Sequence, residues 1–344
     1  MITAEQRELA ESERAWLGKH DPIDHLRSQS GRAGSPEGLA SVDPRALTHV
    51  RESGLASILT ADAGGTHPDL AVLTAAHGRA ASSLPVADLA LGAWLLEFAG
   101  RADLADAHAS GDRVVTVVTS PYGQSLHGDR IAAISAPFVV LPDPADRDLV
   151  VLTDDDALFV LPAGASRRTI ETFATLDLTR PWARARLDVD AAERVALPVG
   201  TASWYRDAIA VHRAVDSVGA AEELLARTVE YAVQREQFGA VIGSFQAVKH
   251  HCATKAVRVS AAQATLGAAV DSLALSEASD RRRPVDAAVA YAADAANSVA
   301  GLAQQVHGGI GFTWEHDLHL YLRRIKVNGN IDGGVRERRR ALVS

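Results

Sequence analysis

The amino-acid sequence predicts an α+β protein that is mostly α-helical. We expect a helical N-terminal domain, a small middle β-domain and a C-terminal four-helix bundle. Apolar residues make up 47% of the 344 residues and aromatic residues only 5%. The core must therefore consist mainly of Ala, Leu and Val, which suits packed helices. Apolar residues recur every three or four positions in the first and last parts of the chain, and short β-branched runs gather between them.

The N-terminal domain is expected to cover residues 1–108. Residues 4–18 have a short helical pattern, whereas residues 19–42 are rich in Gly, Pro and Ser and indicate a loop. From Pro44 to about His108 the pattern is helical again, with mixed three- and four-residue spacing of its apolar positions. This part of the chain is therefore expected to be a trimmed helical domain.

The middle domain is expected to cover residues 109–195. Its apolar runs are short and β-branched, and turn residues such as Pro121-Tyr122-Gly123 separate them. The runs that predict strands are Val114–Val118, Ile131–Ile134, Phe138–Leu141, Leu149–Leu152 and Leu158–Leu161.

The C-terminal domain is expected to cover residues 196–344 and to be helical almost throughout. Val211, Val215 and Val218 begin an apolar stripe that continues to Gln234, which predicts one long helix over 206–234. Three further helices are expected over 245–277, from Pro284 to His307, and over 315–326.

Several classes of function are excluded by composition. The 35 basic and 43 acidic residues give a net charge of −8, which argues against a nucleic-acid partner. The single cysteine, Cys252, cannot form an intrachain disulfide, no run of 18 apolar residues predicts a membrane span, and the N-terminus has no apolar signal region. We therefore expect a cytoplasmic protein. No metal site is predicted, because the adjacent residues of His250-His251-Cys252 point apart on a helix.

Two motifs in the C-terminal half carry a family resemblance. The first is Tyr231-Ala-Val-Gln-Arg235-Glu-Gln-Phe238-Gly239, followed by Ile242-Gly-Ser-Phe245-Gln246, and the second is Gln304-Gln305-Val-His307-Gly308-Gly309-Ile-Gly311-Phe312. Their order and spacing resemble those of the acyl-CoA dehydrogenases. The resemblance is firm over 206–344, fair over 109–195 and weak before that.

The resemblance implies FAD as cofactor. A guanidinium such as that of Arg235 suits the oxygens of a pyrophosphate, and paired glycines allow a backbone to approach a ligand closely. By analogy with the family these residues reach across a subunit interface, so the resemblance also implies an oligomer. The positions that it assigns to FAD contacts are Arg235, Phe238, Gln246, Gln305, Gly308, Gly309 and Gly334.

The resemblance also assigns a catalytic base, although with a departure from the family pattern. Most members carry a Glu in a Tyr-Glu-Gly-Thr turn, and Ile331-Asp332-Gly333-Gly334 falls on these positions. Asp332 would then remove the α-proton of the acyl-CoA, and Gly333 would contact the substrate. Aspartate is one methylene shorter than glutamate, and a misplacement of ~1 Å can cost on the order of 10²-fold in rate.

Three further departures concern the base, the substrate and the flavin ring. Some members carry the base instead on the first long helix of the C-terminal domain, and Ile209 occupies that position here. Asp207 keeps the family aspartate near the pantetheine of the substrate, but its arginine companion is replaced by Ala210. In the middle domain only 119–123 (Thr-Ser-Pro-Tyr-Gly) remains of a longer flavin-ring motif.

These departures leave three interpretations open. The first is a short subunit similar to those of heteromeric steroid-type acyl-CoA dehydrogenases, which shares FAD with a homologous full-length subunit. The second is a self-sufficient acyl-CoA dehydrogenase with Asp332 as base. The third is a related flavoenzyme similar to nitroalkane oxidase. The family resemblance also implies an acyl-CoA substrate from fatty acid or steroid side-chain catabolism and an electron-transfer flavoprotein as electron acceptor.

Overall fold

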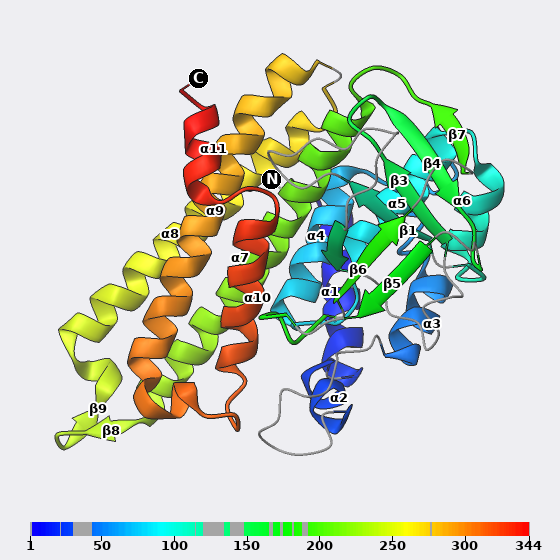
Figure 1. Ribbon diagram of the computed structural model, residues 1–344. Coiled ribbons are helices and arrows are strands. Elements are labelled where there is room, and N and C mark those ends of the chain that lie inside the picture. The colour runs from blue at the N-terminus through cyan, green and yellow to red at the C-terminus, as the bar shows by residue number, and fades with distance from the viewer. Residues whose placement is uncertain are drawn as a thin grey trace.

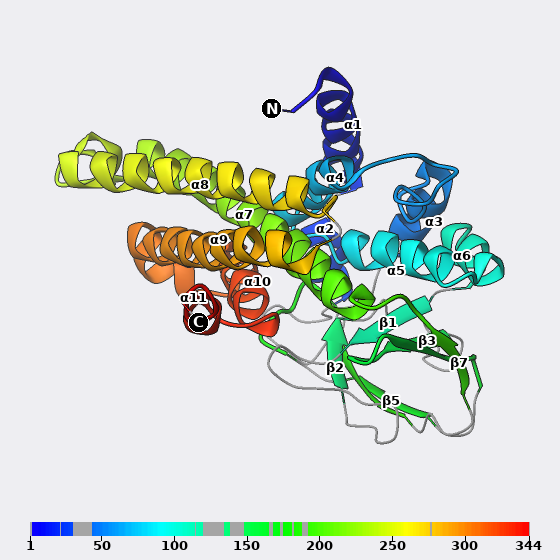
Figure 2. The same ribbon diagram turned by 90° about the horizontal axis from the view of Figure 1, so that it is seen from above.

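The predicted fold class, mostly helical with a small β-part, is confirmed. Three long helices, α7 (Thr201–Gln234), α8 (Gln246–Ser272) and α9 (Ala278–His307), lie side by side and project beyond the rest of the molecule at one end (Figures 1 and 2). The strands β1 to β7 lie on the side away from that end, whereas the short strands β8 and β9 lie at the end itself. The computed structural model describes residues 2–20, 22–29, 43–113, 115–119, 134–137, 148–164, 168–172, 175–180, 182–187, 192–275 and 277–343.

The N-terminal part consists of helices, one of which was not predicted. Helix α2 lies in the segment predicted as a loop, and Pro22 at its first position has the backbone angle that a helix start requires. That prediction was therefore wrong for 22–29, while 30–42 lies outside the described residues. The described helices are α1 (Ala4–His20), α2 (Pro22–Gln29), α3 (Pro44–Ser53), α4 (His67–Arg79), α5 (Val86–Phe98) and α6 (Ala102–Ala109).

The described strands form three sheets, of which the third is the short hairpin of β8 (Glu236–Gln237) and β9 (Ala240–Val241) in the C-terminal part. The first has the order β1-β3-β4-β7, in which only β1 and β3 are parallel, and the second is antiparallel with the order β2-β6-β5. The strands are β1 (Val115–Thr119), β2 (Ile134–Pro137), β3 (Asp148–Leu152), β4 (Ala157–Leu161), β5 (Arg168–Thr172), β6 (Trp182–Leu187) and β7 (Glu193–Ala196). The predicted runs match β1, β3 and β4, and only Ile134 of the run 131–134 lies in β2. The run 138–141 lies outside the described residues. Strands β5, β6 and β7 were missed because charged residues interrupt their sequences.

The described residues of the C-terminal bundle form the four predicted α-helices and a short fifth one. Helix α9 begins at Ala278 and not at Pro284, so that prediction was wrong by six residues. Helix α10 (Leu318–Ile331) begins later and ends later than predicted, and α11 (Val335–Ala341) was not predicted. None of the helices in the described part of the chain is long and apolar enough to cross a membrane.

A close crossing of α4 and α7 joins the N-terminal helices to the bundle. A Cβ on Gly78 would lie 2.2 Å from the carbonyl oxygen of Asp216, and one on Gly219 would lie 2.4 Å from that of Ala75. Only glycine allows the two backbones to approach this closely. The crossing therefore sets the distance between α4 and α7 and the position of the N-terminal helices against the bundle.

Candidate functional site

The first motif forms a hairpin at the projecting end of the bundle. Helix α7 ends at Gln234, and the two-residue strands β8 (Glu236–Gln237) and β9 (Ala240–Val241) follow. The turn between them is Phe238-Gly239, with φ values of 57° and 77°, as a tight hairpin turn requires. Because this turn leads away from the bundle, the Phe238 side chain is 95% exposed.

The second motif forms the turn after α9 at the same end (Figure 1). Gly308 has φ 59° and ψ −137°, a combination that suits glycine. A Cβ on Gly308 or Gly309 would meet nothing within 4 Å, so both backbones face open space. The His307 ring stacks on Tyr231 of α7 with ring centroids 4.4 Å apart, which fastens this turn to the first motif.

The structure brings six of the seven predicted cofactor residues to this end. The side chains of Arg235, Gln246 and Gln305 are exposed, and among the described residues none of the three has a hydrogen-bond partner. The end formed by residues 229–246 and 304–312 is called the bundle tip below. The seventh residue, Gly334, is not part of it and instead precedes α11 as its N-cap.

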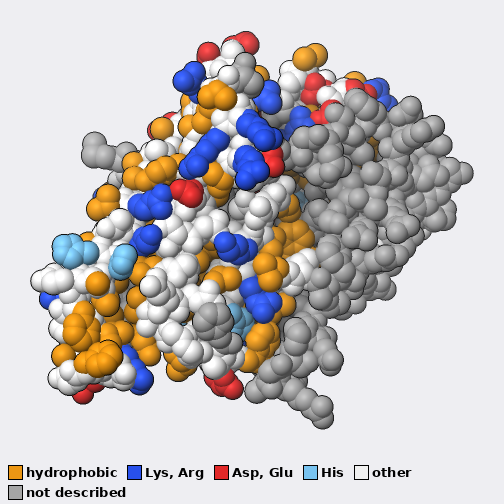
Figure 3. Space-filling view, turned by 60° about the vertical axis from the view of Figure 1, so that its left-hand side comes forward, with side chains coloured by type: hydrophobic (Ala, Val, Ile, Leu, Met, Phe, Trp, Pro, Cys, Tyr) orange, Lys and Arg blue, Asp and Glu red, His pale blue; other side chains and the backbone are white. Residues whose placement is uncertain are grey.

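The bundle tip also exposes large apolar side chains. Hydrophobic side chains gather at this end of the molecule in the space-filling view (Figure 3). Apolar groups gathered on a surface and rimmed by polar ones typically mark an interaction site. The exposed apolar side chains of the tip are Val229, Val233, Phe238, Phe245 and Ile310.

Asp332 lies at the other end of α10 from the glycine turn. The 14 residues of this helix span about 21 Å, so Asp332 and the bundle tip are well separated. One oxygen of Asp332 accepts a hydrogen bond from Arg213 of α7 at 2.7 Å, and Arg213 donates a second bond to Asp88 of α5 at 2.9 Å. The second oxygen, Oδ2, is buried and has no hydrogen-bond partner in the described structure.

Two flanking contacts fix the Asp332 backbone. Arg338 of α11 donates to the Asp332 carbonyl oxygen from Nε and Nη2, at 2.9 and 2.6 Å, and to Asp286 of α9 at 2.6 Å. Gly333 has a φ of 92°, which allows the chain to turn between α10 and α11. A Cβ on Gly334 would lie 2.7 Å from Oε2 of Glu337.

Asp207, the predicted substrate contact, is buried on α7. Arg281 of α9 donates to its carboxylate at 2.9 Å, and this arginine lies within the helix because α9 begins earlier than predicted. Burial raises the pKa of Asp207 above its usual value, and the ion pair with Arg281 only partly offsets it. Ile209 and Ala210, next along the helix, are buried apolar residues.

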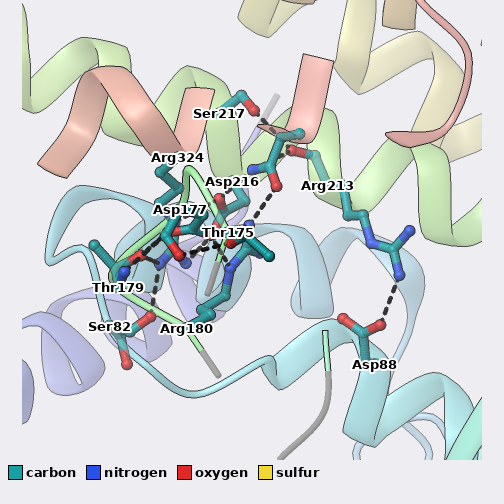
Figure 4. Close-up of polar contacts among 11 residues, drawn as sticks. Ser82, Asp88, Thr175, Asp177, Thr179, Arg180, Arg213, Asp216, Ser217 and Arg324 are labelled. Carbon is teal, nitrogen blue, oxygen red and sulfur yellow. Dashed lines mark hydrogen bonds and ion pairs between the residues drawn. The ribbon is translucent and has the colours of Figure 1, made fainter. Parts of the chain in front are cut away.

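Sequence reasoning missed a buried polar network beside Asp332 (Figure 4). Arg324 of α10 donates two hydrogen bonds to Asp216 of α7, at 2.9 and 2.6 Å, and one each to Ser82 and Thr179. Asn328 donates to Asp216 at 2.7 Å. The network thus ties α10 to α7, to the segment before α5 and to the segment before β6. The sequence signal that could have indicated this network is a charged residue inside an apolar helical stripe, namely Asp216 between Val215 and Val218.

A second part of the network comes from the segment before β6. Asp177 accepts hydrogen bonds from Thr179 and from Arg180, and Arg180 also donates to Asn328. Burial would raise the pKa values of Asp177 and Asp216, but the neighbouring arginines outweigh burial and hold both below their usual range. Both carboxylates are therefore ionised at neutral pH.

Arg213 is the charged centre between Asp88 and Asp332. Burial acts to lower its pKa, but the two carboxylates, Asp332 first, raise it further than burial lowers it. The arginine therefore carries a fixed positive charge beside the candidate base. Of the predicted flavin-ring segment 119–123, the described residues include only Thr119, at the end of β1.

A helical N-terminal part, two small sheets and a long-helix bundle with an exposed motif tip together define an acyl-CoA dehydrogenase fold. Residues 207–344 match the model of the acyl-CoA dehydrogenase C-terminal domain. The chain is 30% identical to the acyl-CoA dehydrogenase IpdE2 of Mycolicibacterium smegmatis, covering 98% of each protein. It therefore belongs to the acyl-CoA dehydrogenase family of oxidoreductases.

Two solved structures have a similar fold. One is a variant of the Tcur3481-Tcur3483 steroid ACAD, with a TM-score of 0.83 and 24% identity over 100% of this chain and 98% of that chain. The other is the ChsE4-ChsE5 complex from Mycobacterium tuberculosis, with a TM-score of 0.82 and 24% identity over 100% and 97% of the two chains.

Proposed function

We propose that this chain takes part in the FAD-dependent α,β-dehydrogenation of an acyl-CoA thioester as one subunit of a heteromeric complex. Its bundle tip would contact FAD held mainly by a homologous partner subunit. The observation that carries the proposal is that Arg235, Gln246 and Gln305 are all exposed at the tip, about 21 Å of helix away from Asp332.

The tip residues fit an FAD that approaches from outside the chain. Arg235 can donate to the pyrophosphate, and the amides of Gln246 and Gln305 offer donors and acceptors for the polar groups beside it. The Gly308-Gly309 backbone leaves open space in which a ligand can lie. The exposed apolar side chains of the tip, such as Phe238, would be covered by the partner. Bound FAD would supply the acceptor for the hydride that leaves the β-carbon.

The pairing of Asp332 supports a partner that supplies the base. One oxygen of the Asp332 carboxylate is already engaged by the hydrogen bond that Arg213 donates at 2.7 Å. The carboxylate is also directed toward α7 by Arg213. In this complex Asp332 would therefore fix the end of α10, and a glutamate of the full-length subunit would remove the α-proton.

A second candidate is a self-sufficient acyl-CoA dehydrogenase with Asp332 as base. It is favoured by Oδ2 of Asp332, which is buried and has no partner in the described structure, so it could accept a proton. The Asp332→Asn variant separates the two candidates. Loss of on the order of 10²-fold or more in kcat would support Asp332 as base, whereas turnover within about threefold would support the heteromeric assignment.

The test of the main proposal is co-expression with a homologous full-length acyl-CoA dehydrogenase. We expect the Arg235→Ala variant to lower the FAD content of the purified complex. The Arg282→Ala variant, which removes an exposed arginine far from the tip, should leave it unchanged. Equal FAD content in both variants would refute the role of the tip. The similarity to a steroid ACAD makes bulky steroid-type acyl-CoA thioesters the first substrates to assay, with an electron-transfer flavoprotein as acceptor.

A further inference from the structure

A surface rich in arginine lies on the first turns of α9 and on the outer side of α11. The two helices pack against each other through the ion pair between Arg338 and Asp286. Lys and Arg side chains gather over them in the upper part of the space-filling view (Figure 3). The exposed arginines of these segments, called the basic surface below, are Arg282, Arg283, Arg336, Arg339 and Arg340.

The basic surface is far from the candidate cofactor site. The 30 residues of α9 span about 45 Å. The basic surface lies at the start of this helix, whereas the glycine turn of the bundle tip follows its end. A ligand of the basic surface would therefore bind independently of FAD.

Two further arginines of the same segments are already neutralised and do not belong to the basic surface. Arg281 is buried and pairs with Asp207 at 2.9 Å. Arg338 is buried and pairs with Asp286 at 2.6 Å. These pairs hold α9 and α11 in place, so the exposed arginines start from defined backbone positions.

The exposed arginines are not neutralised in this way. In the described part of the chain, only Arg339 among them lies near a carboxylate, that of Asp294 at 3.6 Å, and Asp294 already pairs with Arg258 at 2.8 Å. The exposed carboxylates of the same segments are Asp280 and Glu337. Five arginines against two carboxylates leave a formal excess of three positive charges, on a chain whose net charge is −8.

The spacing of the arginines fits an extended partner better than a small anion. Arg336 and Arg340 are one helical turn apart, about 6 Å along α11, and Arg282 and Arg283 lie on the neighbouring helix. Exposed side chains on the outer sides of two helices contact a small anion from one side only. A polypeptide with several carboxylates can contact them together, because each guanidinium offers planar pairs of N–H donors.

A lipid surface and a nucleic acid fit the basic surface less well. Binding at a membrane interface needs an apolar helix face beside the cations. Within the described residues, the only large apolar side chains exposed at the ends of these segments are Leu275 and Val343. A nucleic acid would meet repulsion from the rest of the chain, which has more acidic than basic residues.

We propose that the basic surface docks an acidic segment of a partner protein, with several Asp or Glu side chains close together. The carboxylates of this segment would pair with the exposed arginines of both helices and supply the negative charge that the surface lacks. Exposed ion pairs are individually weak and are screened by salt. The association therefore depends on several pairs at once and is reversible.

The experiment measures the binding of a short, fluorescently labelled polyglutamate peptide to the full-length chain with any co-purified subunit, by fluorescence anisotropy at low salt. A polyglutamine peptide and phosphatidylglycerol vesicles are the comparison probes. We expect only polyglutamate to bind, and more weakly as salt is raised. Because the chain is negative overall, this binding requires a local excess of positive charge. Binding of the vesicles but not of polyglutamate would overturn the proposal.

Matched variants decide whether the basic surface is the site. Arg336→Gln combined with Arg340→Gln should weaken polyglutamate binding about fivefold or more. Arg7→Gln combined with Arg14→Gln, which removes the same charge from exposed positions of α1, should not. All four side chains are exposed, so folding should stay intact. Equal binding by the two double variants, or no binding of polyglutamate to the unaltered protein, would also contradict the proposal.

Discussion

The buried ion pair between Arg324 and Asp216 gives the sharpest stability prediction. Replacing Arg324 by Met keeps an unbranched chain but leaves the Asp216 carboxylate buried without its bidentate partner, since Asp216 is only 5% exposed. Breaking a buried pair from one side costs about 3–5 kcal/mol. That is a large part of the roughly 5–15 kcal/mol by which a native protein is stable.

The assay is urea unfolding at pH 7 of Arg324→Met beside the unaltered protein. Lys326→Ala is the matched control on the same helix, because this lysine is exposed and its loss should change the free energy of unfolding by no more than about 0.5 kcal/mol. Adding Asp216→Asn to Arg324→Met should recover part of the loss, because no uncompensated charge then remains buried. A loss below about 1 kcal/mol for Arg324→Met, or no recovery in the double variant, would refute this reasoning.

Three further predictions follow from other parts of the molecule. Burial lowers the pKa of His67 to about 4 and that of His212 well below its usual value, so the unfolded chain takes up protons that the folded pair excludes. Stability should be full above about pH 7 and fall as the pH drops from about 6.5 toward 4, by about 2 kcal/mol per histidine at pH 5; an unfolding series that stays flat between pH 7 and 5 would contradict this. Gly219→Ala should lower the free energy of unfolding by about 1–3 kcal/mol, because its Cβ would lie 2.4 Å from a backbone oxygen, whereas Gly267→Ala faces open space and should be neutral or stabilising. Phe238→Asp should leave the unfolding free energy unchanged, since this side chain is 95% exposed, but should prevent co-purification with a partner subunit; retained co-purification would exclude the tip from the interface.

The long helices could be predicted from the sequence because their signals are local. The valines of α7 recur at helical spacing along a single face, and the glycines after α9 mark the end of that helix. Strands β5 to β7 could not be predicted, because charged residues hide the apolar alternation on which such a prediction depends. Pro284 was misleading because it lies inside α9 and not at the helix start.

The candidate site shows the same division between local and distant information. The two motifs identified residues that the structure brings to one end of the bundle, because each motif forms its own turn. No local pattern indicates that Arg213 pairs with Asp332, which is 119 positions away. Arg324 and Asp216 are 108 positions apart, and only the folded chain shows that they meet.

The FAD content of the purified chain tests the central claim most directly. The chain should be expressed alone and together with a homologous full-length acyl-CoA dehydrogenase, and bound FAD should be measured per chain from the flavin absorbance. We predict little or no FAD on the chain alone, and FAD together with acyl-CoA-dependent flavin reduction in the complex. A stable homo-oligomer of this chain that binds FAD stoichiometrically and is reduced by an acyl-CoA would contradict the account.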